Sequence, residues 1–99
     1  MNNNKLVGKF KSILIKEDLK ITPQRIVIFE EMMKSDEHRE CEEILLNLKK
    51  NKMNVSRATL YRTLDILVKN NFIRKMDIGD GRVRYEKKIG TLHHDHMIC

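Results

Sequence analysis

One stretch decides the fold, residues 56–87, which read SRATLYRTLDILVKNNFIRKMDIGDGRVRYEK. Ser56 is a residue type that caps helix N-termini, and leucines recur after it at helical spacing. We therefore predict a helix over about residues 57–70. Its inner stripe consists of Leu60, Leu64, Leu67 and Val68.

The second half of this stretch predicts a hairpin. Short strands over 72–77 and 82–87 flank a turn over 78–81, which holds two glycines and so tolerates positive φ. In the second strand Val83 and Tyr85 alternate with charged residues, which indicates one buried face and one exposed face. A helix followed directly by such a hairpin is typical of a DNA-reading helix with a wing.

The segments before this stretch complete the domain. Three further helices are predicted over about residues 5–18, 23–34 and 41–50. The second of them has Thr22 as its cap and Pro23 at its first position, where a missing N–H does no harm. Residues 35–39 are polar and predict a loop. Four helices followed by a two-stranded antiparallel wing describe an α+β winged helix-turn-helix domain.

The composition fits one small domain in a reducing compartment. The chain has 99 residues, 40% hydrophobic and 34% charged, so it is too apolar for a disordered tail and too charged for a membrane protein. No signal-peptide core follows Met1, and two cysteines cannot form a disulfide framework. We expect a cytoplasmic protein in which Cys41 is a small buried residue.

The outer face of the 57–70 helix predicts DNA binding. The residues opposite the leucines are Ala58, Thr59, Arg62 and Ile66, with Tyr61 at the edge. A recognition helix needs this arrangement, because its first turns present small, polar and guanidinium groups to the major groove. Arg57 and Arg62 can reach phosphates or a guanine edge.

The distribution of charge agrees with a polyanionic partner. The net charge is +6, and the chain from Val55 onward carries nine Lys and Arg against five Asp and Glu, whereas residues 1–54 carry eleven against nine. The excess therefore lies on the helix and hairpin that would meet DNA. Arg82 and Arg84, near the wing turn, suit contacts to the backbone or the minor groove.

The C-terminal segment HHDHMIC, residues 93–99, predicts a metal site. If it is a strand, His94 and His96 point to one face, while His93 and Asp95 point to the other. His38 and Glu86 are the partners expected from elsewhere in the chain. Imidazole and carboxylate ligands suit Fe(II), Mn(II) or Zn(II) better than Cu(I).

Two functions of other classes stay open from these residues. One is a winged helix that binds protein through its hairpin or its third helix, and the other is a fragment of a metal-dependent enzyme. We expect no enzyme and no catalytic residues, because the sequence shows no clear general base, no nucleophile arrangement and no phosphate-cradling glycine loop.

Taken together, these motifs resemble the ferric uptake regulator family over about residues 19–99. The matching segments are LKITPQR (19–25), ATLYRTL (58–64), GDGRVRYE (79–86) and HHDHMIC (93–99). The resemblance implies a metal-dependent transcription regulator, usually a repressor of iron-acquisition genes, in a family whose sister branches sense zinc, manganese or peroxide. The peroxide branch usually has Asp where Glu86 stands, so the resemblance favours metal sensing.

The resemblance also implies roles in DNA binding. Lys20 matches a minor-groove contact, and Tyr61 and Arg62 match base and backbone contacts. A dimer would place two such helices on the half-sites of an AT-rich inverted repeat in double-stranded DNA. With the helix face and the wing included, the predicted DNA-binding set is Lys20, Arg25, Arg57, Thr59, Tyr61, Arg62 and Arg82.

For metal, the resemblance implies a regulatory site made of His38, Glu86, His94 and His96, which would hold Fe(II), Mn(II) or Zn(II). On this hypothesis the metal fixes the angle between two domains, and hence the spacing of the two recognition helices in a dimer. Two further matches are incomplete. They are His93 and Asp95 as half of a second site, and Cys99 as the first thiolate of a structural zinc site.

Two departures from the family pattern modify these expectations. Glu40 stands where the family usually has a Ser or Thr cap, so we expect a frayed start of the 41–50 helix. The chain ends at Cys99, about where the family's dimerisation domain begins. We expect a winged-helix domain over 1–89, with a hinge and the start of a truncated metal-binding and dimerisation domain over 90–99. The chain alone would then be a monomer or a weak dimer, with structural zinc only in a longer form.

Overall fold

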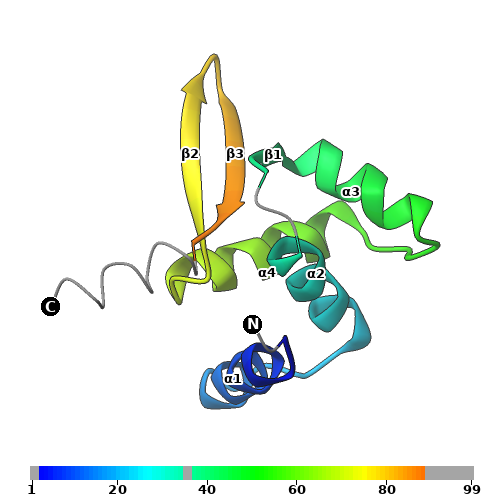
Figure 1. The fold of residues 1–99 in the computed structure, drawn as a ribbon, viewed down its shortest axis with the longest axis vertical. Coiled ribbons are helices and arrows are strands. Elements are labelled where there is room, and N and C mark those ends of the chain that lie inside the picture. The colour runs from blue at the N-terminus through cyan, green and yellow to red at the C-terminus, as the bar shows by residue number, and fades with distance from the viewer. Residues whose placement is uncertain (1–2, 35–36, 89–99) are drawn as a thin grey trace, which may run out of the picture.

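The computed structural model describes residues 3–34 and 37–88. The elements are α1 (Asn3–Lys16), α2 (Pro23–Met33), β1 (Arg39–Glu40), α3 (Cys41–Lys50), α4 (Arg57–Lys69), β2 (Ile73–Gly79) and β3 (Arg82–Lys87). The four helices form the body of the domain, and the β2–β3 hairpin projects from it as a wing (Figure 1). The winged helix-turn-helix prediction is therefore confirmed. No helix within these described ranges is long and apolar enough to cross a membrane.

The sheet has three antiparallel strands in the order β1-β3-β2, one strand more than predicted. The added strand β1 pairs Arg39 with Tyr85 and Glu40 with Arg84. The loop prediction for 35–39 was wrong at Arg39, because a two-residue strand is too short to show an alternating pattern. Its partner lies more than forty positions along the chain, so only the folded state reveals the pairing.

The core is the shared inner surface of the four helices and the base of the sheet. Phe10, Phe29 and Phe72 meet there, with ring centroids 4.7 Å apart for the stacked pair Phe10–Phe29 and 5.1 Å apart for the edge-on pair Phe29–Phe72. The predicted leucine stripe of α4 is confirmed, since Leu60, Leu64 and Leu67 have no exposed surface. This packing fixes the orientation of α4 and leaves its opposite face available.

The helix starts follow the predicted capping chemistry, with one correction. Thr22 accepts a hydrogen bond from the Arg25 N–H at the start of α2, and Ser56 accepts one from the Thr59 N–H at the start of α4. The frayed start predicted for α3 is wrong, because the helix begins at Cys41 directly after β1. Glu43 supplies the cap by accepting a hydrogen bond of 2.8 Å from the backbone N–H of Glu40.

The wing turn lies where the glycines predicted it. Gly79 has a φ of 94° and Gly81 a φ of 73°, and Asp80 between them also has a positive φ of 55°. The Asp77 carboxylate accepts a hydrogen bond of 3.0 Å from the Gly79 N–H and so stabilises the entry to the turn. Arg82 therefore follows the turn as the first residue of β3.

Candidate functional site

The outer face of α4 is largely as predicted. Ala58 and Arg62 are exposed, and Tyr61 is 46% exposed. Within the residues that the structure describes, no carboxylate pairs with Arg62, so its guanidinium is available to a ligand. Ile66 does not lie outward as expected. It is partly buried against the core, because α4 packs on β2 as well as on α2.

A hollow of about 400 Å³ adjoins the start of α4 and combines several groups that attract anions. Lys20, Arg25 and Thr59 line it, together with one acidic residue, Asp18, and the capped N-termini of α2 and α4 both border on it. Helix N-termini present unpaired N–H groups and the positive end of the helix dipole. Arg25 also donates a hydrogen bond of 2.5 Å to the Lys20 carbonyl, which fixes the segment before α2.

The other two predicted arginines are already held by carboxylates. Arg57 donates two hydrogen bonds of 2.6 Å to Glu42, through Nε and Nη2. Arg82 forms an ion pair with Glu40, and the hydrogen bond from Arg82 lowers the pKa of that carboxyl below its usual value. Both pairs are exposed, so a polyanion can compete for the arginines at small cost.

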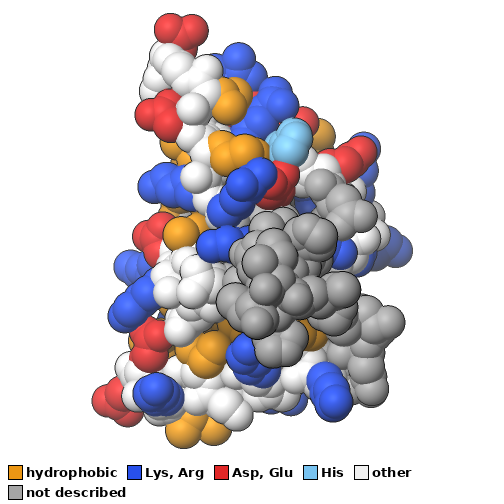
Figure 2. All heavy atoms as spheres, turned by 60° about the vertical axis from the view of Figure 1, so that its left-hand side comes forward, with side chains coloured by type: hydrophobic (Ala, Val, Ile, Leu, Met, Phe, Trp, Pro, Cys, Tyr) orange, Lys and Arg blue, Asp and Glu red, His pale blue; other side chains and the backbone are white. Residues whose placement is uncertain are grey.

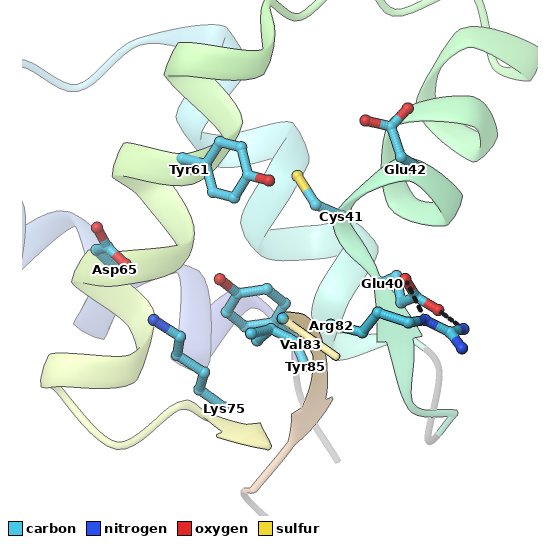
Figure 3. Close-up of a pocket in the computed structure, with 10 residues that line it drawn as sticks. Glu40, Cys41, Glu42, Tyr61, Asp65, Lys75, Arg82, Val83 and Tyr85 are labelled. Carbon is cyan, nitrogen blue, oxygen red and sulfur yellow. Dashed lines mark hydrogen bonds and ion pairs between the residues drawn. The ribbon is translucent and has the colours of Figure 1, made fainter. Parts of the chain in front are cut away.

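A groove of about 460 Å³ separates α4 from the wing and the start of α3 (Figure 3). The Tyr61 hydroxyl points across it toward the Cys41 sulfur, while Asp65 and Lys75 lie farther along the groove. Cys41 is 6% exposed, and burial raises the pKa of its thiol. The prediction of a small buried cysteine is thus confirmed, and a reactive thiolate is not favoured here.

The structure brings His38 and Glu86 together, although they lie 48 positions apart. The pairing of Arg39 with Tyr85 sets His38, the residue before β1, beside Glu86 of β3. The Nδ1 atom of His38 contacts Oε1 of Glu86, whose side chain is only 12% exposed. Figure 2 shows a face of the molecule on which basic side chains, in blue, and acidic side chains, in red, lie next to one another.

An arginine that the sequence did not suggest completes this cluster. Arg74 lies directly opposite Glu86 in the β2–β3 register. Its Nε and Nη2 atoms are both 2.5 Å from Oε2 of Glu86. Both oxygens of the carboxylate are therefore engaged, one by His38 and the other by Arg74.

An imidazole nitrogen beside a carboxylate oxygen is a donor pair that fits Fe(II), Mn(II) or Zn(II). It is only part of a site, because the part of the chain between residues 3 and 88 that the structure describes holds no group of three metal-binding side chains. The other predicted ligands lie outside the described residues. They are His93, His94, Asp95, His96 and Cys99.

Sequence reasoning also missed the support beneath His38. Arg39 is 8% exposed and forms an ion pair of 2.5 Å with Glu31 of α2, which is 3% exposed. Asn47 of α3 donates a further hydrogen bond to the same carboxylate. The only signal for this ion pair in the sequence was the presence of charged residues beside the apolar stripe of a helix. Such residues more often form a solvated face than a buried ion pair.

Comparisons with known proteins bear on both the candidate DNA-binding surface and the candidate metal-binding pair. The family model described as the ferric uptake regulator family matches residues 16–99. The chain is 36% identical over 96 residues to the ferric uptake regulation protein of Campylobacter jejuni, covering 95% of this chain and 60% of that protein. It is 31% identical over 86 residues to the peroxide-responsive repressor PerR of Staphylococcus epidermidis, covering 87% of this chain and 56% of that protein.

Among solved structures, the chain superposes on the Helicobacter pylori ferric uptake regulator Fur, a structure described as revealing three functional metal-binding sites. The TM-score is 0.79 at 26% identity, over 89% of this chain and 59% of that one. The chain thus spans about three-fifths of the length of the relatives that it matches.

Proposed function

Because the chain belongs to the ferric uptake regulator family, we propose that it acts as a metal-dependent transcriptional repressor that binds double-stranded DNA. The role is binding, and no catalytic step is assigned to any residue. The protein acts where the chromosomal DNA is, in the cytoplasm. The favoured target is an AT-rich inverted repeat, bound by a homodimer of the full family architecture.

One observation carries the DNA-binding part of the proposal, the convergence of cationic and helix-terminal groups beside the open face of α4. Lys20 and Arg25 border the same hollow as the N-termini of α2 and α4. A backbone phosphate fits this environment, since it accepts hydrogen bonds from N–H groups and is attracted by both the dipoles and the side chains. With a phosphate there, Arg62 and Tyr61 would reach base edges from the adjoining turn of α4.

The wing extends this surface. Arg82 follows the turn of the hairpin and is exposed, so it would contact the DNA backbone or the minor groove. Arg57 at the start of α4 would contact a neighbouring phosphate. On binding, Arg82 would leave Glu40 and Arg57 would leave Glu42, and each arginine would contact a phosphate oxygen instead.

For the metal, His38 and Glu86 would act as ligands from the winged-helix domain, and His94 and His96 as ligands from the segment that follows it. When bound, a divalent cation would link these side chains by coordination. The protein's own contribution is β1, whose pairing with β3 holds His38 against Glu86. The domain boundary near residue 89 and the partial sites at His93, Asp95 and Cys99 belong to the same proposal.

Peroxide sensing is the second candidate, because a peroxide-responsive repressor is among the relatives. Metal sensing stays favoured, since the residue beside His38 is Glu86 and the family's peroxide branch usually has Asp at that position. Loss of operator binding after peroxide treatment of the iron-loaded protein, with oxidation of a ligand histidine, would select the second candidate.

A DNA titration tests the proposal. We expect the anisotropy of a labelled AT-rich inverted-repeat duplex to rise on addition of the chain at about 50 mM salt, and the affinity to fall steeply by about 200 mM salt, because phosphate contacts release counterions. Adding Mn(II) tests whether the metal strengthens binding. No binding at the lower salt concentration by folded protein, with or without Mn(II), would contradict DNA binding by this chain.

A further inference from the structure

We propose that Arg74 competes with a divalent cation for the Glu86 carboxylate and thereby sets the metal affinity of the His38–Glu86 pair. This inference rests on the metal-binding part of the proposed function and concerns a residue to which neither the family pattern nor the sequence gives a role. Arg74 is a built-in counter-cation, and its removal would tighten metal binding.

The geometry of Glu86 carries the inference. Arg74 is directly opposite it in the strand register, and two guanidinium nitrogens lie 2.5 Å from Oε2. His38 engages Oε1. A carboxylate offers about four lone-pair positions, and here both oxygens are already used by donors within the described residues. A cation that approached Oε2 would meet a guanidinium there.

Burial makes this contact stronger than an ordinary surface ion pair. The Glu86 side chain is 12% exposed, so water screens its charge poorly. Charge-assisted hydrogen bonds from a guanidinium are among the strong ones, and they would have to be given up or shared. A divalent cation and the guanidinium would also repel each other at this distance.

The exposure of Arg74 allows the exchange. Its side chain is 53% exposed, so the guanidinium can move into water and remain hydrated when Glu86 takes another partner. Glu86 needs no guanidinium to keep its orientation, because His38 contacts its other oxygen and its backbone is held in β3 by the pairing with β2. We therefore expect that the net effect of Arg74 on metal binding is to compete for Glu86, rather than to hold Glu86 in place.

The test compares Arg74→Gln with Lys75→Gln in the 99-residue chain. The two residues are neighbours on β2, and each substitution removes one positive charge, but Lys75 lies opposite Tyr85 and lines the groove on the other face. Free Mn(II) is measured by electron paramagnetic resonance during a titration. We expect Arg74→Gln to tighten Mn(II) binding about tenfold, as loss of a charge-assisted hydrogen bond allows, and Lys75→Gln to change it less than about twofold.

Two further variants locate the effect. Arg74→Lys keeps the charge but loses the two-nitrogen contact, so we expect a smaller gain than with Arg74→Gln. In a Glu86→Gln background the gain should disappear, because Arg74 then has no carboxylate to compete for, which distinguishes this pair from metal held by the other histidines. Equal affinities of Arg74→Gln and Lys75→Gln, or weaker binding by Arg74→Gln, would overturn the inference. Absence of Mn(II) binding by the wild type and every variant would instead overturn the metal-binding part of the proposed function.

Discussion

Replacing Glu31 by Ala is expected to lower the free energy of unfolding by about 3–5 kcal/mol, the range for removing one partner of a buried ion pair. Glu31 and Arg39 are both almost fully buried, and the variant leaves the guanidinium without its carboxylate. Asn47 would lose the same acceptor. Because α2, β1 and α3 meet at this carboxylate, the loss would weaken the connection that carries His38. Urea denaturation followed by circular dichroism measures the change.

Two controls make this prediction sharp. Glu30→Ala removes the neighbouring exposed carboxylate of α2 and should change stability by no more than about 0.5 kcal/mol. The double variant Glu31→Leu with Arg39→Met removes both charges, and it should recover most of the lost stability, since apolar replacements of a buried pair are often neutral. A loss below about 1 kcal/mol in Glu31→Ala would show that the pair contributes little.

The effect of Glu31 should depend on pH in a fixed direction. Burial by itself raises the pKa of this carboxyl, but hydrogen bonds from Arg39, Lys34 and Asn47 outweigh it and leave the pKa below its ordinary value of 4.5. A lowered pKa in the folded state means that the stabilisation is fully present above pH 4.5 and is lost as the pH falls through the folded pKa. The difference between wild type and Glu31→Ala should therefore shrink only in acid.

Replacing Arg62 by Ala is expected to weaken binding to the inverted-repeat duplex about 10- to 100-fold, which corresponds to the 1–3 kcal/mol of a good guanidinium contact. Arg62 is exposed on α4, so the fold should keep its stability. The salt dependence separates two kinds of contact. The slope of log affinity against log salt should fall by about 0.9 if Arg62 binds a phosphate, and should stay unchanged if it binds a base edge.

Lys49→Ala is the matched control for Arg62→Ala. It removes one exposed positive charge from the last turn of α3, away from the start of α4, so we expect an affinity change of less than about threefold. If both variants weakened binding equally, the interaction would depend on net charge rather than on the recognition helix. That result would favour non-specific attraction over the proposed interface.

The helices and the wing were predictable because each has a local signal. The leucine spacing of α4, the caps at Thr22 and Ser56, and the glycines of the turn are all read within a few residues. β1 had no such signal, since two residues show no period and their partner strand is distant in sequence. The start of α3 was misjudged because the capping carboxylate comes from Glu43, three residues after Glu40.

The residues of the candidate site also divide into those that could be predicted from the sequence and those that could not. Arg57 and Arg62 could be found from helix geometry and Arg82 from its place beside the wing turn, while His38 and Glu86 could be named as partners of the histidine segment and matched by the resemblance to a family. The carboxylates that engage the first and last of these arginines could not, because ion pairs between side chains depend on tertiary packing. Arg74 could not be predicted either, because an irregularity in the strand pairing between Asp77 and Gly79 shifts the register by one residue and so sets position 74, rather than 75, opposite position 86.

The central claim is that the start of α4, the hollow beside it and the wing together bind DNA. Nuclear magnetic resonance of the ¹⁵N-labelled chain, with and without the inverted-repeat duplex, tests it most directly. We predict that the amide shift changes gather at residues 20–25, 56–62 and 79–82, which form this surface. Changes centred instead on the exposed Leu46 face of α3, or binding with no change at α4, would contradict the claim and favour a winged helix that uses a different surface.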